Sequence, residues 1–207
     1  MANPEHLEKL MEGVDAWNKW RKGLPRATLD LSGAKLREVD LIEANFREVY
    51  LEEADLTRSK LDRADLRGSE LSRADLSGVH LKGADLSGAY LRGADLRDAV
   101  LREADLRGAH LNGADLRRVN LSNADLSNAD LNGADLRDAD LRGAHLNGAD
   151  LTRTALVSTI LEGANLTACR VYGISAWNVR LKAAIQCNIV ITPADEPDIQ
   201  VDRWNVT

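Results

Sequence analysis

The sequence is dominated by a leucine at every fifth position. From Leu31 to Leu166 every fifth residue is Leu, with Phe46 as the sole exception, which makes 28 consecutive pentapeptides over residues 29 to 168. Five residues advance an α-helix by about 500°, so successive leucines would point to different sides of a helix. On a continuous strand an odd period places alternate leucines on opposite faces. The chain must therefore turn once in every repeat.

Each pentapeptide, numbered about its central residue i, reads as a short strand followed by a tight turn. Position i−2 is Ala in 19 of the 28 repeats, and the residue between it and the central Leu is nearly always polar, which is an in, out, in pattern. Position i+2 is often Gly or Asn, which tolerate the positive φ of the third residue in a type II turn. Corners with larger residues, such as Glu38, Arg63 and Arg118, are expected to form without positive φ.

A bend of about a quarter turn per repeat predicts a four-sided solenoid of about seven coils, stacked at about 4.8 Å. Residues 20 apart should then lie above one another. Because only 4 % of the residues are aromatic, the interior is expected to be filled by Leu and Ala. The Ser and Thr residues that replace Ala at i−2 are expected to mark looser layers: Ser59, Ser69, Thr154 and Thr159.

The stretch ADLRGAHLNGADL, residues 104 to 116, and its neighbours resemble the pentapeptide-repeat family, whose consensus is A(D/N)LXX. The resemblance covers about two-thirds of the chain. It implies an all-β solenoid, namely a right-handed quadrilateral β-helix, in a bacterial protein with an N-terminal helical cap.

Both ends of a β-helix need covers, because an open end exposes unpaired backbone groups and apolar core. Residues 1 to 28 are expected to form a capping helix and linker, with Asn3 as N-cap and Pro4 at the first helical position. Apolar residues at helical spacing should lie over the first coil: Leu7, Leu10, Met11, Val14 and Trp17. Gly23 and Pro25 should end the helix. The alternative is that this apolar face is a groove for a partner.

Residues 169 to 207 are expected to hold an eighth, degenerate coil and a short β-rich cap. Two β-runs flank a turn bounded by prolines, and Trp204 could close the end. The tail also resembles a segment that precedes a further domain in other family members. The repeats could therefore be a spacer or adaptor for a domain absent from this chain.

Stacking at 20 residues predicts columns of surface charge. Two columns at i−1 are acidic: Asp55, Asp75, Asp95, Asp115 and Asp135 in one, and Asp65, Asp85, Asp105 and Asp125 in the other. Carboxylates about 5 Å apart are expected to raise one another's pKa. Arg97, Arg117 and Arg137 lie at i+1 on the same face as the first column, where they are expected to pair with the aspartates and offset the ladder.

These columns favour a non-enzymatic scaffold that binds a protein partner, as yet unidentified, through a rigid charged wall. The preferred contact residues are Asp95, Arg97, Asp115, Arg117, Asp135 and Arg137. The alternative is a DNA mimic, because the family's fluoroquinolone-resistance branch resembles B-form DNA and binds gyrase or topoisomerase IV, usually as a two-fold dimer joined at the C-terminal ends. The 25 acids and 18 bases of residues 29 to 168 weigh against it. Both a monomer and an end-to-end dimer stay open.

The sequence gives little support for catalysis or for a metal or cofactor site. The predicted column Glu70, Tyr90, His110, Asp130 and Asp150 lies on a wall without a cleft, so we expect no catalysis, metal or cofactor there. Cys169 should be a buried thiol, and the reactivity of Cys187 cannot be judged from the sequence. A net charge of −6, the lack of long apolar runs and the sparse cysteines favour a cytoplasmic protein that binds neither nucleic acid directly nor a membrane.

Overall fold

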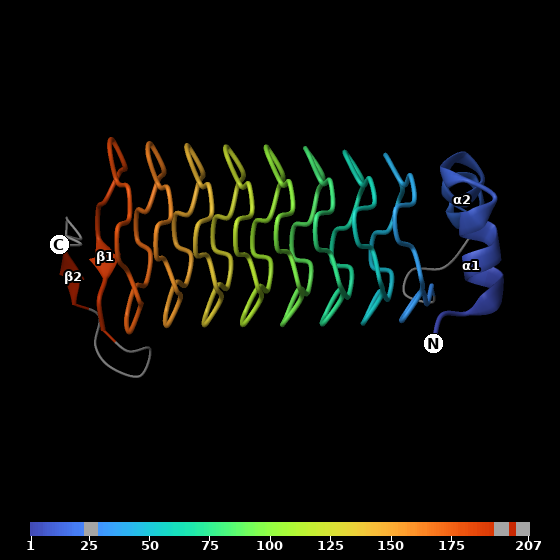
Figure 1. Cartoon of the computed structure of the whole chain (residues 1–207), viewed down its shortest axis with the longest axis horizontal. Coiled ribbons are helices and arrows are strands. Elements are labelled where there is room, and N and C mark those ends of the chain that lie inside the picture. Colours follow the sequence, from blue (N-terminus) through green and yellow to red (C-terminus); the bar gives the residue numbers. More distant parts are fainter. Residues whose placement is uncertain (23–28, 193–198, 202–207) are drawn as a thin grey trace.

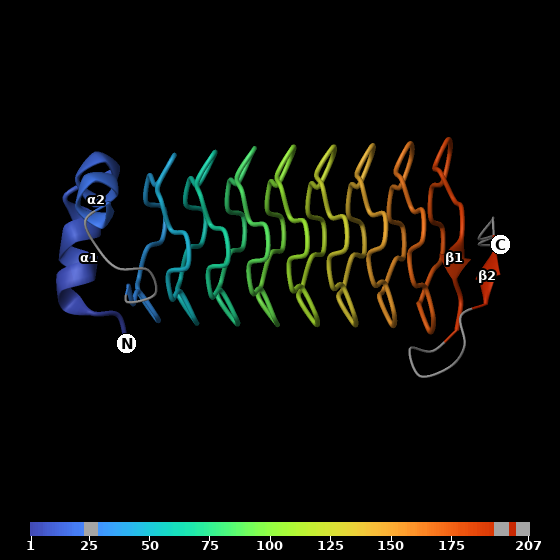
Figure 2. The same cartoon turned by 180° about the vertical axis from the view of Figure 1, so that it is seen from behind.

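The computed structural model describes residues 1–22, 29–192 and 199–201, which form a long stack of coils with helices at one end (Figure 1). The elements along the chain are α1 (Pro4–Met11), α2 (Val14–Arg21), the coils, β1 (Ile189–Val190) and β2 (Gln200–Val201). The coils follow one another in sequence order, and β1 and β2 lie at the end opposite the helices, as the reverse view also shows (Figure 2).

Every coil is joined to the next by parallel bridges at a spacing of 20 residues. The bridges run without interruption from Asp30 with Tyr50 to Arg170 with Val190. In a typical layer the backbone N–H of Leu96 donates to the carbonyl of Asp115 at 2.8 Å. The N–H of Asp115 in turn donates to the carbonyl of Ala94 at 3.0 Å. The predicted right-handed quadrilateral β-helix is confirmed, and the degenerate eighth coil belongs to it.

The interior is a shaft of Leu and Ala. Every central residue from Leu31 to Leu166 is at most 1 % exposed. The layers with Ser or Thr at i−2 are not looser, so that expectation was wrong. Those side chains are buried and their hydroxyls donate to backbone carbonyls, as Thr154 does to Leu131 at 3.0 Å and Thr159 to Leu136 at 2.8 Å. A hydroxyl that finds an acceptor inside the shaft can replace a methyl without leaving an unpaired polar group.

The corners are uniform, which corrects the expectation of two corner types. Glu38, Arg63 and Arg118 have φ of 59°, 56° and 58°, as the Gly and Asn corners also have positive φ. The second residue of each turn does not, so the corners have the type II pattern. The reason is the stacking: the N–H of Glu38 donates to the carbonyl of Thr57 in the next coil at 2.9 Å, and each corner from Gly33 to Ala168 repeats this bond. The ladder holds the conformation whichever side chain is present.

The N-terminal cap contains two helices where one was expected. Asn3 is the N-cap, and its side chain accepts from the N–H of Glu5 at 2.9 Å. The helix breaks at Gly13, whose φ is 113°. Met11 therefore points to solvent and is 62 % exposed, whereas Trp17 is fully buried. Gly23 and Pro25 lie outside the described residues.

Trp17 joins the cap to the first coil. Its ring centroid lies 5.7 Å from that of Phe46, and its indole N–H donates to the carbonyl of Asn45 at 2.8 Å. Phe46, the one Phe that replaces a central Leu, thus packs against the cap.

At the other end β1 pairs with β2 in antiparallel register, which confirms the β-rich cap. The eighth coil is less tightly packed, because Ala176 and Leu181 are only half-buried at inward positions. The proline-bounded turn and Trp204 lie outside the described residues.

Candidate interaction surface

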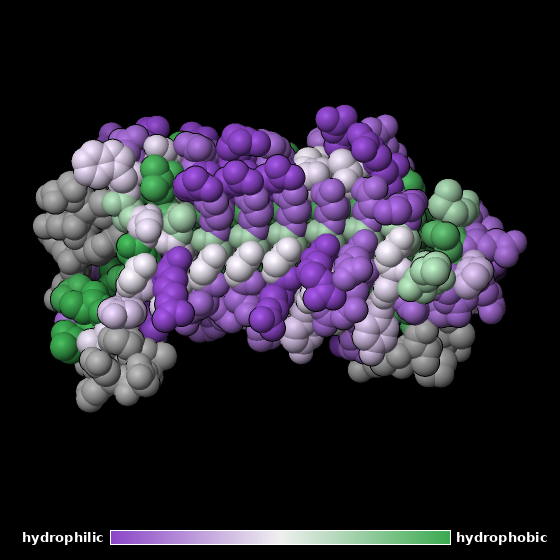
Figure 3. Space-filling view, turned by 60° about the horizontal axis from the view of Figure 1, so that its bottom comes forward, coloured by the Kyte–Doolittle hydropathy of each residue, from purple (hydrophilic) through white to green (hydrophobic). Residues whose placement is uncertain are grey.

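Each coil presents four walls to solvent. We name them after four outward residues of one coil: the Tyr90, Asp95, Val100 and Asp105 walls. Each wall comprises the pentapeptides stacked on that residue at intervals of 20. Figure 3 shows hydrophilic side chains aligned in rows along the long axis, with a pale green row of moderately hydrophobic residues between them and the most hydrophobic residues mainly toward the two ends.

The Asp95 wall brings all six candidate contact residues into one ladder. The Nε of Arg97 donates to both carboxylate oxygens of Asp95, at 2.8 and 2.9 Å. Arg117 and Arg137 bond the aspartate two residues before them in the same way, with Nε–Oδ1 distances of 2.8 Å each. In these three coils the strand residue and its turn residue therefore form a charged pair.

The pairs also connect from coil to coil. The Nε of Arg97 lies 3.6 Å from the Oδ2 of Asp115, and that of Arg117 lies 3.8 Å from Asp135. Each of these arginines contacts one carboxylate in its own coil and a second in the following coil. The carboxylates from Asp95 to Asp135 are thus interleaved with guanidinium groups.

The pKa values of Asp55, Asp105 and Asp135 are lowered instead of raised. The pKa of Asp135 is held below its ordinary value mainly by the hydrogen bond from Arg137, and that of Asp105 by the bond from Arg107. The pKa of Asp55 is lowered mainly by the hydroxyl of Thr57. The expectation of raised values was wrong for these three aspartates, because a donor within about 3 Å outweighs a like charge one coil away, about 5 Å distant.

The Asp105 wall has the same pairs at a lower density. Arg67 and Arg107 bond Asp65 and Asp105, whereas the hydroxyl of Ser87 in the coil between them donates to Asp85 at 2.7 Å. Over residues 29 to 168 the Tyr90, Asp95, Val100 and Asp105 walls carry net charges of −3, −1, −1 and −2. The acidic excess is spread around the solenoid and forms no single stripe.

The Tyr90 wall contains the predicted column with Glu70, His110, Asp130 and Asp150. The rings of Tyr90 and His110 stack at 4.8 Å with an angle of 6° between their planes. Among the described residues, no three His, Cys, Asp or Glu side chains cluster in a way that could hold a metal ion. Within residues 1–22, 29–192 and 199–201 no helix is long and apolar enough to cross a membrane.

The sequence interpretation missed an exposed aromatic residue at the C-terminal end of the Asp95 wall. Backbone bonds link the turn residues Arg137, Val157 and Trp177 from coil to coil, and Trp177 is 67 % exposed. The column of Arg97, Arg117 and Arg137 thus continues into apolar side chains. A Trp at an outward turn position, where the other repeats have mostly polar residues, was the available signal.

A Leu-filled stack of 20-residue coils with patterned walls defines a repeat solenoid, a class of protein that acts through its extended outer surface. The sequence profile described as Pentapeptide repeats matches the chain in eight copies, over residues 30–68, 59–98, 69–108, 99–138 and 134–171. The chain belongs to this family.

Several solved structures are similar. HetL from Nostoc sp. strain PCC 7120, a pentapeptide repeat protein involved in heterocyst differentiation regulation, is 28 % identical, with 84 % of this chain and 94 % of HetL covered and a TM-score of 0.38. QnrB1, a plasmid-mediated fluoroquinolone resistance protein, is 20 % identical over 75 % of this chain and 86 % of its own, with a TM-score of 0.49. A pentapeptide repeat protein of the Arabidopsis thaliana thylakoid lumen is 30 % identical over 57 % of this chain and 71 % of its own, with a TM-score of 0.40. No curated protein sequence matches the chain. The family assignment rests on the profile match.

Proposed function

We propose that this protein is a non-enzymatic scaffold that binds a protein partner through the Asp95 wall. The contact residues are Asp95, Arg97, Asp115, Arg117, Asp135 and Arg137. The observation that carries the proposal is the ladder of paired side chains from Asp95 to Arg137, with the exposed Trp177 two coils further along the same wall.

The ladder is suited to recognition because its long side chains are already ordered. Fixing a flexible side chain at an interface costs roughly 0.5–1.5 kcal/mol, and the arginines held by Asp95, Asp115 and Asp135 avoid much of that cost. Cations and carboxylates that alternate at about 4.8 Å along the axis would specify register and partner choice more than affinity. Trp177 would supply the apolar anchor, because Trp is among the residues that most often dominate binding energy.

The test is capture of partners from native-host lysate on the tagged full chain, read by mass spectrometry. The key variant reverses three charges: Arg97→Glu, Arg117→Glu and Arg137→Glu. The matched control reverses Arg67→Glu and Arg107→Glu, which form the same pairs on the Asp105 wall. A third variant, Trp177→Ala, tests the apolar end.

A protein that is lost with the triple reversal and with Trp177→Ala, but retained by the Asp105-wall control, would support the proposal. Equal loss in the control would show a general charge effect, and retention in all three variants would place the contact on another wall. Either of these two results would overturn the proposal.

A second candidate is a DNA mimic directed at a type II topoisomerase. The observation in its favour is the unbroken stack of five carboxylates from Asp55 to Asp135. The interleaved arginines and the spread of charge over four walls weaken the field that such a mimic needs. Inhibition of gyrase supercoiling at micromolar protein would support this candidate. Full supercoiling activity at that concentration would leave the scaffold as the better proposal.

A further inference from the structure

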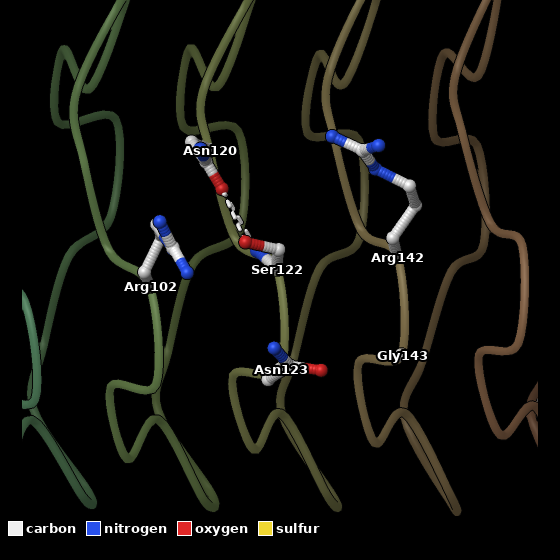
Figure 4. Close-up of a pocket in the computed structure, with 6 residues that line it drawn as sticks. All are labelled: Arg102, Asn120, Ser122, Asn123, Arg142 and Gly143. Atoms are coloured by element: carbon white, nitrogen blue, oxygen red, sulfur yellow. Dashed lines mark hydrogen bonds between the residues drawn. The ribbon is translucent and has the colours of Figure 1, made fainter.

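The Val100 wall has a hollow between the turns of three successive coils. It is lined by Arg102, Asn120, Ser122, Asn123, Arg142 and Gly143 (Figure 4). Arg102, Ser122 and Arg142 are the turn residues of three successive coils. The N–H of Glu103 donates to the carbonyl of Ser122 at 3.1 Å, and that of Asn123 donates to the carbonyl of Arg142 at 2.9 Å. A short side chain therefore lies between two long basic ones.

The spacing of the two arginines fits a tetrahedral oxyanion. Two coils separate Arg102 from Arg142, which is about 9.6 Å at the stacking distance of a sheet. An anion whose oxygens are about 2.5 Å apart, bonded on each side at about 2.9 Å, spans about 8 Å. Figure 4 shows the two guanidinium groups on either side of Asn120 and Ser122. Both arginines can therefore reach one anion without leaving their coils.

The charge pattern around the hollow lacks a carboxylate at its centre. Six turn arginines bond an aspartate two residues before them, but Arg102 follows Val100 at that position. Within the described residues, the ion-pair contact of Arg102 is Glu103, at 3.9 Å. The middle coil has the neutral Asn120 where the Asp95 wall has Asp115. A ligand oxyanion would thus take the place that carboxylates occupy elsewhere.

The Arg142 guanidinium uses only some of its N–H groups in its ion pair with Asp140. Its Nε and Nη2 donate to the carboxylate of Asp140, with an Nε–Oδ1 distance of 2.9 Å. The planar fork of a guanidinium has five N–H donors, so such a pair leaves donors for a second acceptor. Neutral polar groups complete the lining. The Ser122 hydroxyl donates to the Oδ1 of Asn120 at 2.7 Å, and the amide oxygen of Asn123 points toward Gly143, which leaves its nitrogen on the Ser122 side (Figure 4).

We propose that the hollow between Arg102 and Arg142 binds a phosphate group, either as the free ion or as a monoester. The arginines bond the oxyanion from opposite sides, and the side-chain nitrogen of Asn123 donates from between them. The short side chain of Ser122 leaves the space that the anion occupies. This site is separate from the proposed protein contact on the Asp95 wall, and its test does not depend on that partner.

The direct test is a titration of the full chain with inorganic phosphate and, separately, with phenyl phosphate. At about pH 7.5 both probes are largely dianions, because their second pKa lies near 6 to 7. Ionic strength is held constant with sodium chloride, and the amide signals of Ser122, Asn123 and Gly143 are followed by NMR. We expect saturable shifts at these residues with Kd on the order of 1–10 mM. Tighter binding of phenyl phosphate would indicate a monoester ligand, and equal binding the free ion.

Three variants distinguish specific phosphate binding in the hollow from nonspecific attraction of phosphate to surface arginines. Arg102→Gln removes one clamp, and Ser122→Gln fills the hollow without changing charge. Arg92→Gln is the control, because Arg92 is a single turn arginine stacked between Ser72 and Asn112 on the Tyr90 wall. We expect Arg102→Gln and Ser122→Gln to raise Kd about tenfold or more, since a hydrogen bond to a charged group contributes about 1.5–3 kcal/mol. Arg92→Gln should leave Kd unchanged.

A graft provides a second, positive test. Five substitutions, Asp95→Val, Asp115→Asn, Arg117→Ser, Arg118→Asn and Asp138→Gly, reproduce the arrangement between Arg97 and Arg137. They should create a second saturable site on the Asp95 wall. Shifts that do not saturate, or binding that survives Ser122→Gln or falls equally with Arg92→Gln, would overturn the proposal. The far-UV circular dichroism of each variant shows whether the solenoid is intact.

Discussion

The side-chain oxygen of Asn123 lies 2.5 Å from the point where a Cβ on Gly143 would stand, one coil further along the chain. Gly143 also has a φ of +66°. Sixteen corners of the repeat block have positive φ without glycine, so the φ angle alone does not explain a glycine. At position 143 the absence of a Cβ lets the Asn123 side chain lie over the next corner.

This contact predicts that Gly143→Ala destabilises the solenoid more than Gly113→Ala does. Both positions have similar φ, +66° and +68°, but a Cβ at Gly113 would meet no atom within 4 Å. The left-handed conformation should cost about 1–2 kcal/mol in each variant. Gly143→Ala should lose up to about 1 kcal/mol more, because Asn123 must move. Chemical denaturation measures both free energies of unfolding.

The cause of that difference can be isolated by a second substitution. Asn123→Gly removes the side chain that a new Cβ would meet, so Gly143→Ala in that background should cost the same as Gly113→Ala. An unchanged gap between the two alanine variants would assign the effect to something other than Asn123.

The shaft predicts a graded cost for truncating its leucines. Leu116→Ala, in a fully packed layer where Leu116 is 1 % exposed, should cost about 2–5 kcal/mol. Leu181→Ala, at the same inward position of the loosely packed eighth coil, should cost less than half as much because Leu181 is only half-buried. Denaturant unfolding of both variants provides the comparison. Equal costs would mean that the eighth coil is as tightly packed as the middle of the stack.

The ladder on the Asp95 wall predicts a stability that falls in acid. The pKa of Asp135 in the folded chain is lowered from its ordinary value of 3.8, mainly by the hydrogen bond from Arg137. A lowered folded-state pKa favours the ionised form on folding, so this contribution is present above about pH 4 and is lost as the pH falls through the folded-state value. Arg137→Gln should therefore move the pKa of Asp135 up toward 3.8, measured by NMR titration of the carboxyl carbon.

The control for this titration lies on the neighbouring wall. Arg107→Gln should raise the pKa of Asp105, whose lowering has the same main cause, and should leave Asp135 unchanged. If Asp135 titrated identically with and without the Arg137 guanidinium, the pairing would contribute nothing to its ionisation.

The two cysteines are predicted to react very differently. Cys169 is fully buried, its thiol donates to the carbonyl of Leu146 at 2.9 Å, and burial raises its pKa to about 12. Cys187 is exposed. Because the thiolate is the reactive form, native protein should be alkylated by iodoacetamide at Cys187 and not at Cys169. Peptide mass spectrometry reads the sites, with denatured protein as the control in which both react. Labelling of Cys169 under native conditions would indicate that the last coils open.

The sequence determined the shaft and the columns. A Leu at every fifth residue, with Ala two residues before it, permits one path in which the apolar side chains all point inward, and the stacking of residues 20 apart follows from four such turns. The pairing of Arg97 with Asp95 could also be predicted, because residues i−1 and i+1 share one side of a short strand.

Only the tertiary structure showed that the hydrogen bonds between coils, and not the residue type at a corner, determine the backbone conformation of that corner. Glu38 and Arg63 accept positive φ because the hydrogen bonds between coils fix every corner alike. The period of the sequence stacks Arg102, Ser122 and Arg142, but the hollow beside Ser122 also depends on the directions in which the side chains of Asn123 and the two arginines point. The period of the sequence fixes where each backbone atom lies, but packing between coils decides which side chains meet, because neighbours in the stack are 20 residues apart in the chain.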